Sequence, residues 1–421
     1  MKKYQEIIIC SLLTAVIGAV VGITAGVFGQ LLHTAEEFRN EYYIFIVPFL
    51  GFAGVGMLYL YKHISPNSEQ GLNLAIAYNM GKANEDGVVE KQTRKQRLGK
   101  FPKAYAPLKL ISNLIMLFFG ASTGKEGSFA AFGASIGDYL ARITKSRRYS
   151  HVLLISGVAA AVSGLFQTPL GGMFFALEFT VAGVMVYSML IPTFICAFTA
   201  YFFSKLCGYT AFYHAVTANI DINIQNILAV IGISLVFGFI GKLFAIILKK
   251  AHSIYHRKIK NRYLFILITG SAMAIIFILL GGRYCGTGAN IITDVFVNNS
   301  FNSYDFALKF IFTIVCIVAG YTGGEMMPLL TIGATLGALS ASITGLPFEL
   351  AAAMGCVAVY ASATNTLVAP IFIGIEMFGT DAALFIAAAC IIAYATNGKE
   401  SVYTMQGHIT KNIYRRLGKE E

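Results

Sequence analysis

The sequence predicts an all-α polytopic membrane protein, built from two inverted-topology repeats that contain interrupted helices. Three observations carry this prediction: an apolar composition, a succession of short hydrophobic runs, and a glycine-rich segment that occurs twice. Of the 421 residues, 56% are hydrophobic and only 13% are charged, whereas a soluble domain carries about 25% charged residues. Most of the surface is therefore expected to face lipid. No polar linker divides the chain, so we expect a single transmembrane domain over 1–421, without a cytosolic regulatory domain.

Apolar runs follow one another along the chain, and several are too short for a full crossing of the bilayer, which takes roughly 20 residues. Short runs that end in Gly, Ser or Pro indicate helices that stop part-way through the membrane. Such breaks are tolerated where the backbone is buried in protein or lines a polar cavity. The first run has no small-residue cleavage site, so it is interpreted as a retained helix. The runs lie near 7–32, 44–61, 106–120, 152–166, 169–187, 188–206, 226–248, 263–281, 306–320, 327–343, 349–361, 367–378 and 382–396.

The net charge of +11 is distributed unevenly, which sets the expected orientation in the membrane. The connection Cys207–Gln225 contains no Lys or Arg, whereas basic residues gather in four other stretches. By the positive-inside rule, both termini and the basic loops are expected in the cytoplasm, with the protein in the plasma membrane. This pattern argues against a nucleic-acid partner. The basic stretches are Lys82–Lys103, Arg142–Arg148, Lys249–Arg262 and Lys411–Arg416.

The seven cysteines stand singly inside apolar segments, without a Cys-x-x-Cys pair. They are interpreted as small buried residues, and neither a disulfide, a metal nor a cofactor is expected.

The glycine-rich segment Gly120–Gly137 aligns with Gly320–Gly337, and this is the most informative feature of the sequence. The charge pattern makes the run 7–32 travel outward and the run 226–248 travel inward, so the two halves are expected to be inverted. The repeats are expected at about 1–206 and 220–405, followed by a short cytoplasmic tail over 406–421. Inverted repeats with interrupted helices are typical of transporters, whose substrate site lies near the bilayer midplane between the repeats. Further aligned pairs are Gln167 with Asn365, Thr168 with Thr366, and Glu178 with Glu376.

Two motifs, Gly124–Ser128 and Gly323–Pro328, each precede an apolar helix. Glycines let the backbone turn tightly and approach a ligand, and Pro328 suits a first helical turn. These helix starts, with another after Gly71, would direct unpaired N–H groups and positive dipole ends inward. The combination predicts an anion site that contains no full positive charge.

Glu126 lies in the first of these motifs, where the anion would bind. A carboxylate there mimics the anion and blocks its path, whereas a protonated carboxyl is neutral and can move aside. One side chain would then both gate the anion and carry the proton. The alternative is an N-terminal glutamate that merely compensates the helix dipole. An ionisable side chain within the membrane favours the functional interpretation.

The combination of motifs resembles the CLC family of anion channels and transporters. Gly124–Gly127 resembles the family's signature, Gly323–Pro328 its second anion-site motif, and Gly398–Tyr403 the segment that carries an anion-coordinating tyrosine. The resemblance extends over nearly the whole chain. It implies the CLC fold and a homodimer in the lipid bilayer, with one anion pathway in each subunit. It also gives Glu126 the role of the gating and proton-carrying glutamate.

Departures from the chloride transporters make the chain resemble the fluoride/proton antiporter branch. Leu72 stands in place of a serine, Met326-Met327 in place of Phe-Ala, and Glu325 adds an acidic residue. In this branch Glu325 would be the second acidic group for proton movement. The inner proton-transfer glutamate of the chloride/proton exchangers aligns with Phe179, and Met327 stands where the fluoride branch often has a threonine.

The function implied is export of fluoride from the cytoplasm in exchange for protons. A chloride/proton exchanger and a passive CLC-type channel are the alternatives; an intramembrane enzyme lacks motif support.

Phe129 would contact fluoride through its ring edge, support Glu126 or simply pack, and Asn73 would donate to the anion or cap its helix. Glu178 and Glu376 are interpreted as structural or vestibule residues. The expected anion-binding residues are Leu72, Asn73, Gly127, Phe129, Met326, Met327 and Tyr403.

Overall fold

The computed structural model describes residues 2–64, 71–76, 101, 104–144, 149–217 and 223–408. Most of the basic loop Lys82–Lys103 and most of the tail 406–421 lie outside these ranges, as do the stretch Lys411–Arg416 and the end of Arg142–Arg148. The expectations for those segments therefore remain expectations.

The first half of the described chain is helical from α1 to α9. Its elements are α1 (Lys2–Glu41), α2 (Tyr43–Ile46), η1 (Val47–Phe49), α3 (Leu50–Ile64), an unlabelled helical turn at 71–76, α5 (Tyr105–Phe118), α6 (Glu126–Ile143), α7 (Ser150–Phe166), α8 (Pro169–Glu178), η5 (Tyr187–Met189) and α9 (Leu190–Leu206).

The second half is helical from α10 to α17. Its elements are α10 (Ile224–Lys258), α11 (Arg262–Leu279), α12 (Ala289–Val297), α13 (Asp305–Ala319), α14 (Met326–Thr344), α15 (Phe348–Thr364), α16 (Val368–Phe378) and α17 (Ala383–Asn397). Within the described ranges, the strands form only one short parallel pair, between β1 (Val181–Ala182) and β2 (Gly407–His408).

Helix lengths confirm the prediction of a membrane protein with interrupted helices. Six described helices, including α1, α10 and α11, are long and apolar enough to cross a bilayer. Others, such as α5, α7, α15, α16 and α17, have only 10–17 residues. The long α1 exposes a row of aliphatic side chains that includes Ile8, Leu12, Val16 and Val20. Such a surface is stable in lipid rather than in water.

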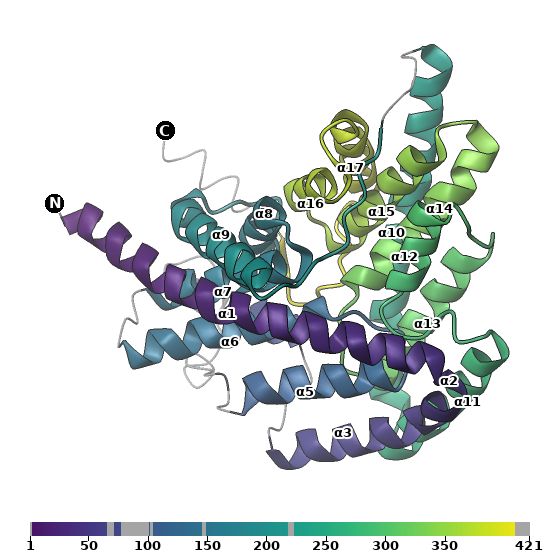
Figure 1. Ribbon diagram of the computed structural model, residues 1–421, viewed down its shortest axis with the longest axis horizontal. Helices are drawn as coiled ribbons and strands as arrows, with labels where there is room; N and C mark the ends of the chain where they lie inside the picture. Colours follow the sequence, from purple (N-terminus) through teal and green to yellow (C-terminus); the bar gives the residue numbers. More distant parts are fainter. Residues whose placement is uncertain are drawn as a thin grey trace.

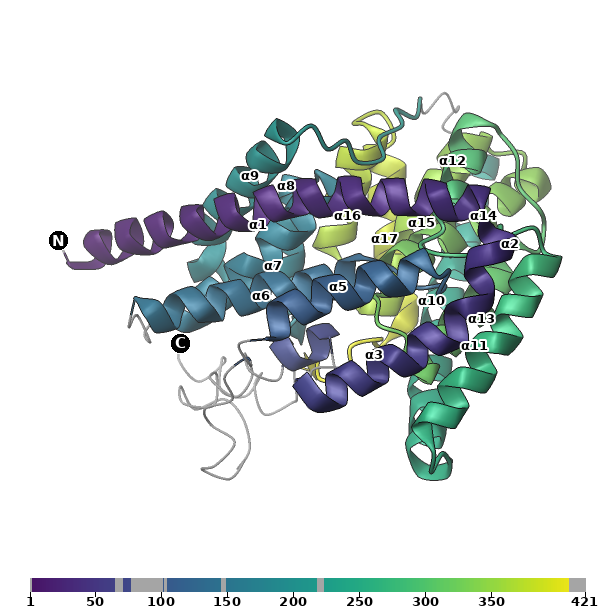
Figure 2. The ribbon, with the colours of Figure 1, turned by 60° about the horizontal axis from the view of Figure 1, so that its bottom comes forward.

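The two halves of the chain lie largely on opposite sides of the molecule (Figure 1). Helices α5 to α9 form one side, α12 to α17 form the other, and α1 crosses the front of the structure. Figure 2 shows that α1, α5 and α6 run side by side, beneath residues 207–217, which follow α9. The starts of α6 and α14 lie between these sides, so the fold places two helix N-termini in the interior.

Close packing of glycines supports both central helix pairs. A Cβ atom on Gly133 of α6 would collide with the carbonyl oxygen of Gly157 on α7, and one on Gly333 of α14 would collide with that of Gly355 on α15. Small residues let membrane helices approach until their backbones touch. The aligned glycines of the two repeats therefore allow the same close contact between helix backbones.

Glu178 and Glu376 each cap a helix of the other half. The Glu178 carboxylate, at the end of α8, accepts hydrogen bonds of 3.0 Å from the backbone N–H groups of Val368 and Ala369 at the start of α16. In return, the Glu376 carboxylate, at the end of α16, accepts from Leu170 at 3.0 Å and Gly171 at 2.9 Å. Negative groups at helix N-termini are stabilising, so both glutamates have a structural role.

Candidate functional site

The helix starts of the two halves are joined directly by their backbones. The N–H of Gly124 donates to the oxygen of Gly324 over 2.5 Å, and the N–H of Gly324 donates to the oxygen of Gly124 over 2.8 Å. Asn113 supports both loops, because its Nδ2 donates to the oxygen of Gly124 at 3.2 Å and to that of Thr322 at 3.3 Å. A Cβ on Gly127 would lie only 2.8 Å from the Cα of Gly324, so glycine permits this approach.

A small cavity of about 10 Å³ lies at this junction of the two halves. Six of the predicted site residues line it together, from the turn at 71–76, from both helix starts and from the segment after α17. They are Leu72, Glu126, Gly127, Glu325, Met326 and Tyr403. Sequence reasoning missed the remaining lining residues, Ala130, Val162 and Phe175. Nothing in their sequence context distinguishes them from other apolar residues of membrane helices.

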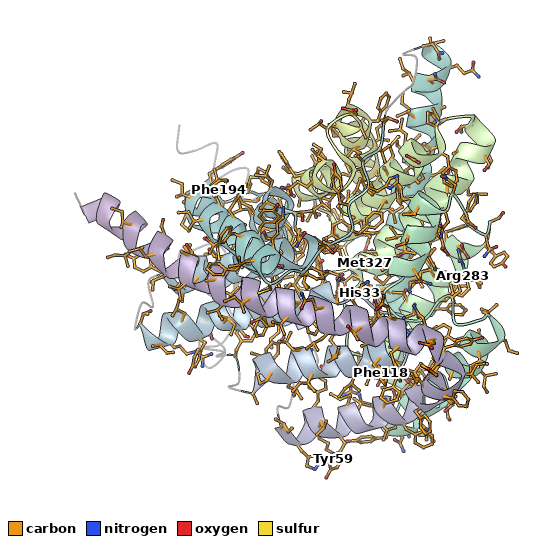
Figure 3. The ribbon with its side chains drawn as sticks, viewed as in Figure 1. His33, Tyr59, Phe118, Phe194, Arg283 and Met327 are labelled. Carbon is orange, nitrogen blue, oxygen red and sulfur yellow. The ribbon has the colours of Figure 1, made fainter. Side chains whose placement is uncertain are left out.

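Glu126 is only 3% exposed and begins α6 beside this cavity. Its Oε2 atom accepts a hydrogen bond of 3.4 Å from the backbone N–H of Met327, at the start of α14. Its Oε1 atom is buried and has no hydrogen-bond partner within the described part of the chain. A buried polar atom without a partner is costly, so this oxygen is suited to receive a proton. Met327 lies near the middle of the molecule, between the two halves (Figure 3).

Glu325 lies near two tyrosines. Its carboxyl interacts electrostatically with the side chain of Tyr403, and Tyr403 interacts with that of Tyr360 on α15, whose hydroxyl has no hydrogen-bond partner within the described part of the chain. The ring of Phe175 packs against both tyrosines, with centroids 6.2 Å from Tyr403 and 6.4 Å from Tyr360. Tyr360 is fully buried. Sequence reasoning missed Tyr360, although a tyrosine in a helix that is otherwise apolar and small-residue rich is a usable signal.

Three predicted site residues lie beside the cavity rather than in its lining. Phe129 is fully buried and stacks on Phe28 of α1, with ring centroids 5.4 Å apart, a contact that agrees with the packing alternative. Asn73 accepts a hydrogen bond of 3.4 Å from the N–H of Met405 through its Oδ1 atom. Met327 contributes its backbone N–H to Glu126, as described above.

The arrangement can bind a small anion and exchange protons. Two helix N-termini and their loop N–H groups provide partial positive charge without a metal. Two carboxyl groups in one cavity provide places for a proton. Among the described residues, no group of three or more His, Cys, Asp or Glu side chains is arranged to hold a metal ion.

The fold and the site define a membrane transport protein in which two helix starts meet at one cavity. A family model described as "Voltage gated chloride channel" matches residues 83–398. The "Chloride/fluoride channel protein" of Pseudomonas syringae pv. tomato is 30% identical over 408 residues, which cover 94% of this chain and 86% of that protein. The chain therefore belongs to the voltage-gated chloride channel family, the CLC family, as the motifs indicated.

Two solved structures show the same architecture. The structure of a CLC-type fluoride/proton antiporter matches with a TM-score of 0.90 and 34% identity, covering 96% of this chain and 99% of the other. The structure of a slow cyanobacterial Cl⁻/H⁺ antiporter matches with a TM-score of 0.78 and 17% identity, covering 98% of each chain. The second likeness concerns the fold alone, and together the matches confirm the predicted fold class.

Proposed function

We propose that this protein is a proton-coupled antiporter that exports fluoride from the cytoplasm in exchange for protons. The observation that carries the proposal is the pair of carboxyl groups, Glu126 and Glu325, in the lining of one cavity between two helix starts. A passive channel needs an anion path but no such pair of proton acceptors. The proposal assigns no enzymatic reaction, metal or cofactor to the chain.

In the proposed cycle, Glu126 and the anion compete for the N–H groups at the two helix starts. The ionised carboxylate is held by the N–H of Met327 and closes the anion path. When Glu126 takes up a proton, it becomes neutral, loses its attraction to the helix dipole and moves aside. A fluoride ion then occupies the vacated place, and the proton passes on when the carboxyl returns.

Further residues shape the anion site in this proposal. Leu72 and Met326 would provide an apolar wall, and Gly127 would offer its backbone N–H. Tyr403 would present its hydroxyl from the cytoplasmic side, next to Glu325. Asn73, Phe129 and Met327 would support these groups from behind.

The choice of fluoride is supported by the sequence departures and by the relatives. Glu325 stands in the second motif and Leu72 replaces a serine, and the solved structure of 34% identity is a fluoride/proton antiporter. Export by proton exchange suits fluoride, because HF crosses membranes and releases fluoride inside a near-neutral cell. Chloride transport is the second candidate, since the relative of 30% identity is named a chloride/fluoride channel. Because that relative is called a channel, passive anion conduction is the alternative to proton exchange.

We further propose a homodimer in the plasma membrane, with both termini in the cytoplasm. The basic stretch Lys249–Arg262 covers the end of α10 and the start of α11, whereas the connection Cys207–Gln225 contains no Lys or Arg. The domain is one transmembrane unit with repeats at about 1–206 and 220–405 and a cytoplasmic tail over 406–421. Protons, fluoride (or chloride) and lipid are its partners, and nucleic acid is not.

Ion fluxes from liposomes that contain the purified protein test the proposal. A fluoride electrode should record efflux that an inward proton gradient accelerates, while a pH probe records proton uptake into the same vesicles. Chloride efflux from matched vesicles should be slower. Fluoride efflux without proton movement would overturn the exchange mechanism, and equal or faster chloride efflux would overturn the fluoride assignment.

A further inference from the structure

Lys125, the residue before the gating glutamate, is held by a tyrosine that lies 84 positions away in the sequence. The Lys125 Nζ donates a hydrogen bond of 2.9 Å to the Tyr209 hydroxyl and lies 5.5 Å from the centre of its ring. The same hydroxyl donates its own hydrogen to the carbonyl oxygen of Leu165 over 3.1 Å. Because that hydrogen is used, the oxygen offers Lys125 its lone pairs.

Tyr209 is itself fixed by two helices. Its ring packs on Gly29 of α1, where any Cβ atom would collide with it. Gln167, which ends α7 in a left-handed conformation with φ 55°, donates through its Nε2 to the carbonyl oxygen of Tyr209. The Oε1 of Gln167 accepts from the N–H of Ala211 over 3.4 Å. Tyr209 is therefore only 6% exposed although it lies in a connection.

The same connection, residues 207–217, continues to the second half of the molecule. It leaves α9, passes α16 and leads toward the start of α10 (Figure 1). The N–H of His214 donates to the oxygen of Met377 over 3.0 Å, and the N–H of Val216 donates to that of Phe378 over 2.8 Å. The segment that carries Tyr209 is thus attached to both halves.

The charge of Lys125 acts directly on the gate. Lys125 and Glu126 are neighbours in the chain and interact electrostatically. The other ionisable groups that act on Glu126 are Glu36 of α1, Glu325 before α14 and Tyr360 of α15. Lys125 is the cation of this set, and the energy of a charge pair depends on its separation. The place at which Tyr209 holds the ammonium therefore determines how strongly the ionised gate is retained.

The second half contains a matching arrangement. The repeat aligns Lys125 with Glu325, and Glu325 interacts with Tyr403. Tyr209 follows the last helix of the first half and Tyr403 follows the last helix of the second. In each half, a tyrosine from the segment after the last helix interacts with the residue that precedes the central helix.

We propose that Tyr209 is a positioning residue of the gate, the outer counterpart of Tyr403. It holds the Lys125 ammonium and keeps it from pairing with the Glu126 carboxylate. This inference rests on the proposed function in one respect, the gating role of Glu126. Without the Tyr209 hydroxyl, the ammonium turns to the carboxylate, and more acidic conditions are needed to open the gate.

The test compares Tyr209→Phe, which keeps the ring and removes the hydroxyl, with the wild type in the liposome flux assay. The expected result is a loss of anion flux at neutral pH of about threefold or more, with half-maximal flux at a lower pH. Tyr213→Phe on the same segment is the matched control, since Tyr213 is 65% exposed, and it should behave as the wild type. An unchanged rate and pH profile in Tyr209→Phe would overturn the proposal.

A second comparison shows whether Tyr209 acts through Lys125. In a Lys125→Gln background, Tyr209→Phe should have no further effect on the pH profile. An equal shift of the pH profile in the wild-type and Lys125→Gln backgrounds would overturn the proposal, because Tyr209 would then act through packing and not through Lys125. Gln167→Leu removes the hydrogen bond to the Tyr209 carbonyl without changing a contact of Lys125. It should shift the pH profile of anion flux in the same direction, and it replaces Tyr209→Phe as the test if that variant folds poorly.

These readouts separate the inference from the proposed function. The anion flux and its pH profile can be measured with either fluoride or chloride, whichever the protein transports. Proton movement is measured separately in the wild type. Absence of proton movement in the wild type would overturn the exchange mechanism alone. Additive effects of the two substitutions on the anion flux and its pH dependence would overturn the role of Tyr209 alone.

Discussion

The starts of α6 and α14 have the same backbone plan and different charges. Both follow a glycine-rich loop, and the loops pair through Gly124 and Gly324. In the first half the acid is Glu126, the first residue of α6, whereas in the second it is Glu325, the residue before α14. A shift of one position turns Glu126 toward the N–H of Met327 and Glu325 toward the side chain of Tyr403. Two similar scaffolds therefore supply two unequal acids to one cavity.

The largest expected effect concerns an ion-pair cluster at the start of α13. The residue at the aligned start of α5 is Tyr105 rather than an acid. Asp305 is fully buried and binds Arg283 at 2.8 Å and the Tyr284 hydroxyl at 2.6 Å. Asp305→Ala removes the partner of the Tyr284 hydroxyl and the buried one of the two carboxylates that bind Arg283. It should lower the free energy of unfolding by about 3–5 kcal/mol. Thermal unfolding in detergent measures the loss. Arg283 lies at the edge of the molecule (Figure 3).

The control for this cluster is Asp294→Ala. Asp294 is 30% exposed where it pairs with Arg283, so its loss should cost about 1 kcal/mol or less. Equal destabilisation by both variants would show that burial of Asp305 is not what makes the cluster strong.

Glu126→Gln tests the first acid of the comparison. The amide keeps the size of the side chain but cannot carry a proton, so proton uptake should fall by about 10²-fold or more while the protein remains folded. Proton flux is measured with a pH probe in liposomes. Glu37→Gln, whose side chain is 68% exposed on α1, should leave it unchanged. Normal proton flux in Glu126→Gln would remove this residue from the mechanism.

Glu325→Gln tests the second acid and should have a smaller effect. The amide can still bind the Tyr403 hydroxyl, so the anion site should persist while proton uptake falls by about tenfold. The ratio of fluoride to proton flux measures the change in coupling. If the ratio in Glu325→Gln equals that of the wild type, the cavity contains only one functional acid.

The smallest expected effects concern the parts of the two halves that are alike. Glu178→Gln and Glu376→Gln each weaken the cap of the opposite helix, at a cost of about 1 kcal/mol. The two losses, read from thermal unfolding, should be similar and should leave the fluoride-to-proton ratio intact. A change in that ratio for either variant would indicate that the glutamate serves transport as well as structure.

The sequence by itself determined the fold class, the two glycine-rich helix starts and six residues of the cavity lining. These features depend on local information: hydropathy reports burial in lipid, glycine and proline mark helix starts, and the repeat shows that two segments have equivalent surroundings. Glu126 was found from its motif, whereas Glu325 and Tyr403 were assigned through the resemblance to the CLC family.

Only the tertiary structure decided which side chains share the cavity and what holds them. Phe129 follows the motif of Glu126, yet its side chain packs on α1. The roles of Tyr209 and Tyr360 depend on partners that are distant in the sequence. Lys125, for example, lies 84 positions from Tyr209. A side chain's direction depends on the packing of several helices, and no local pattern in a uniformly apolar sequence encodes that packing.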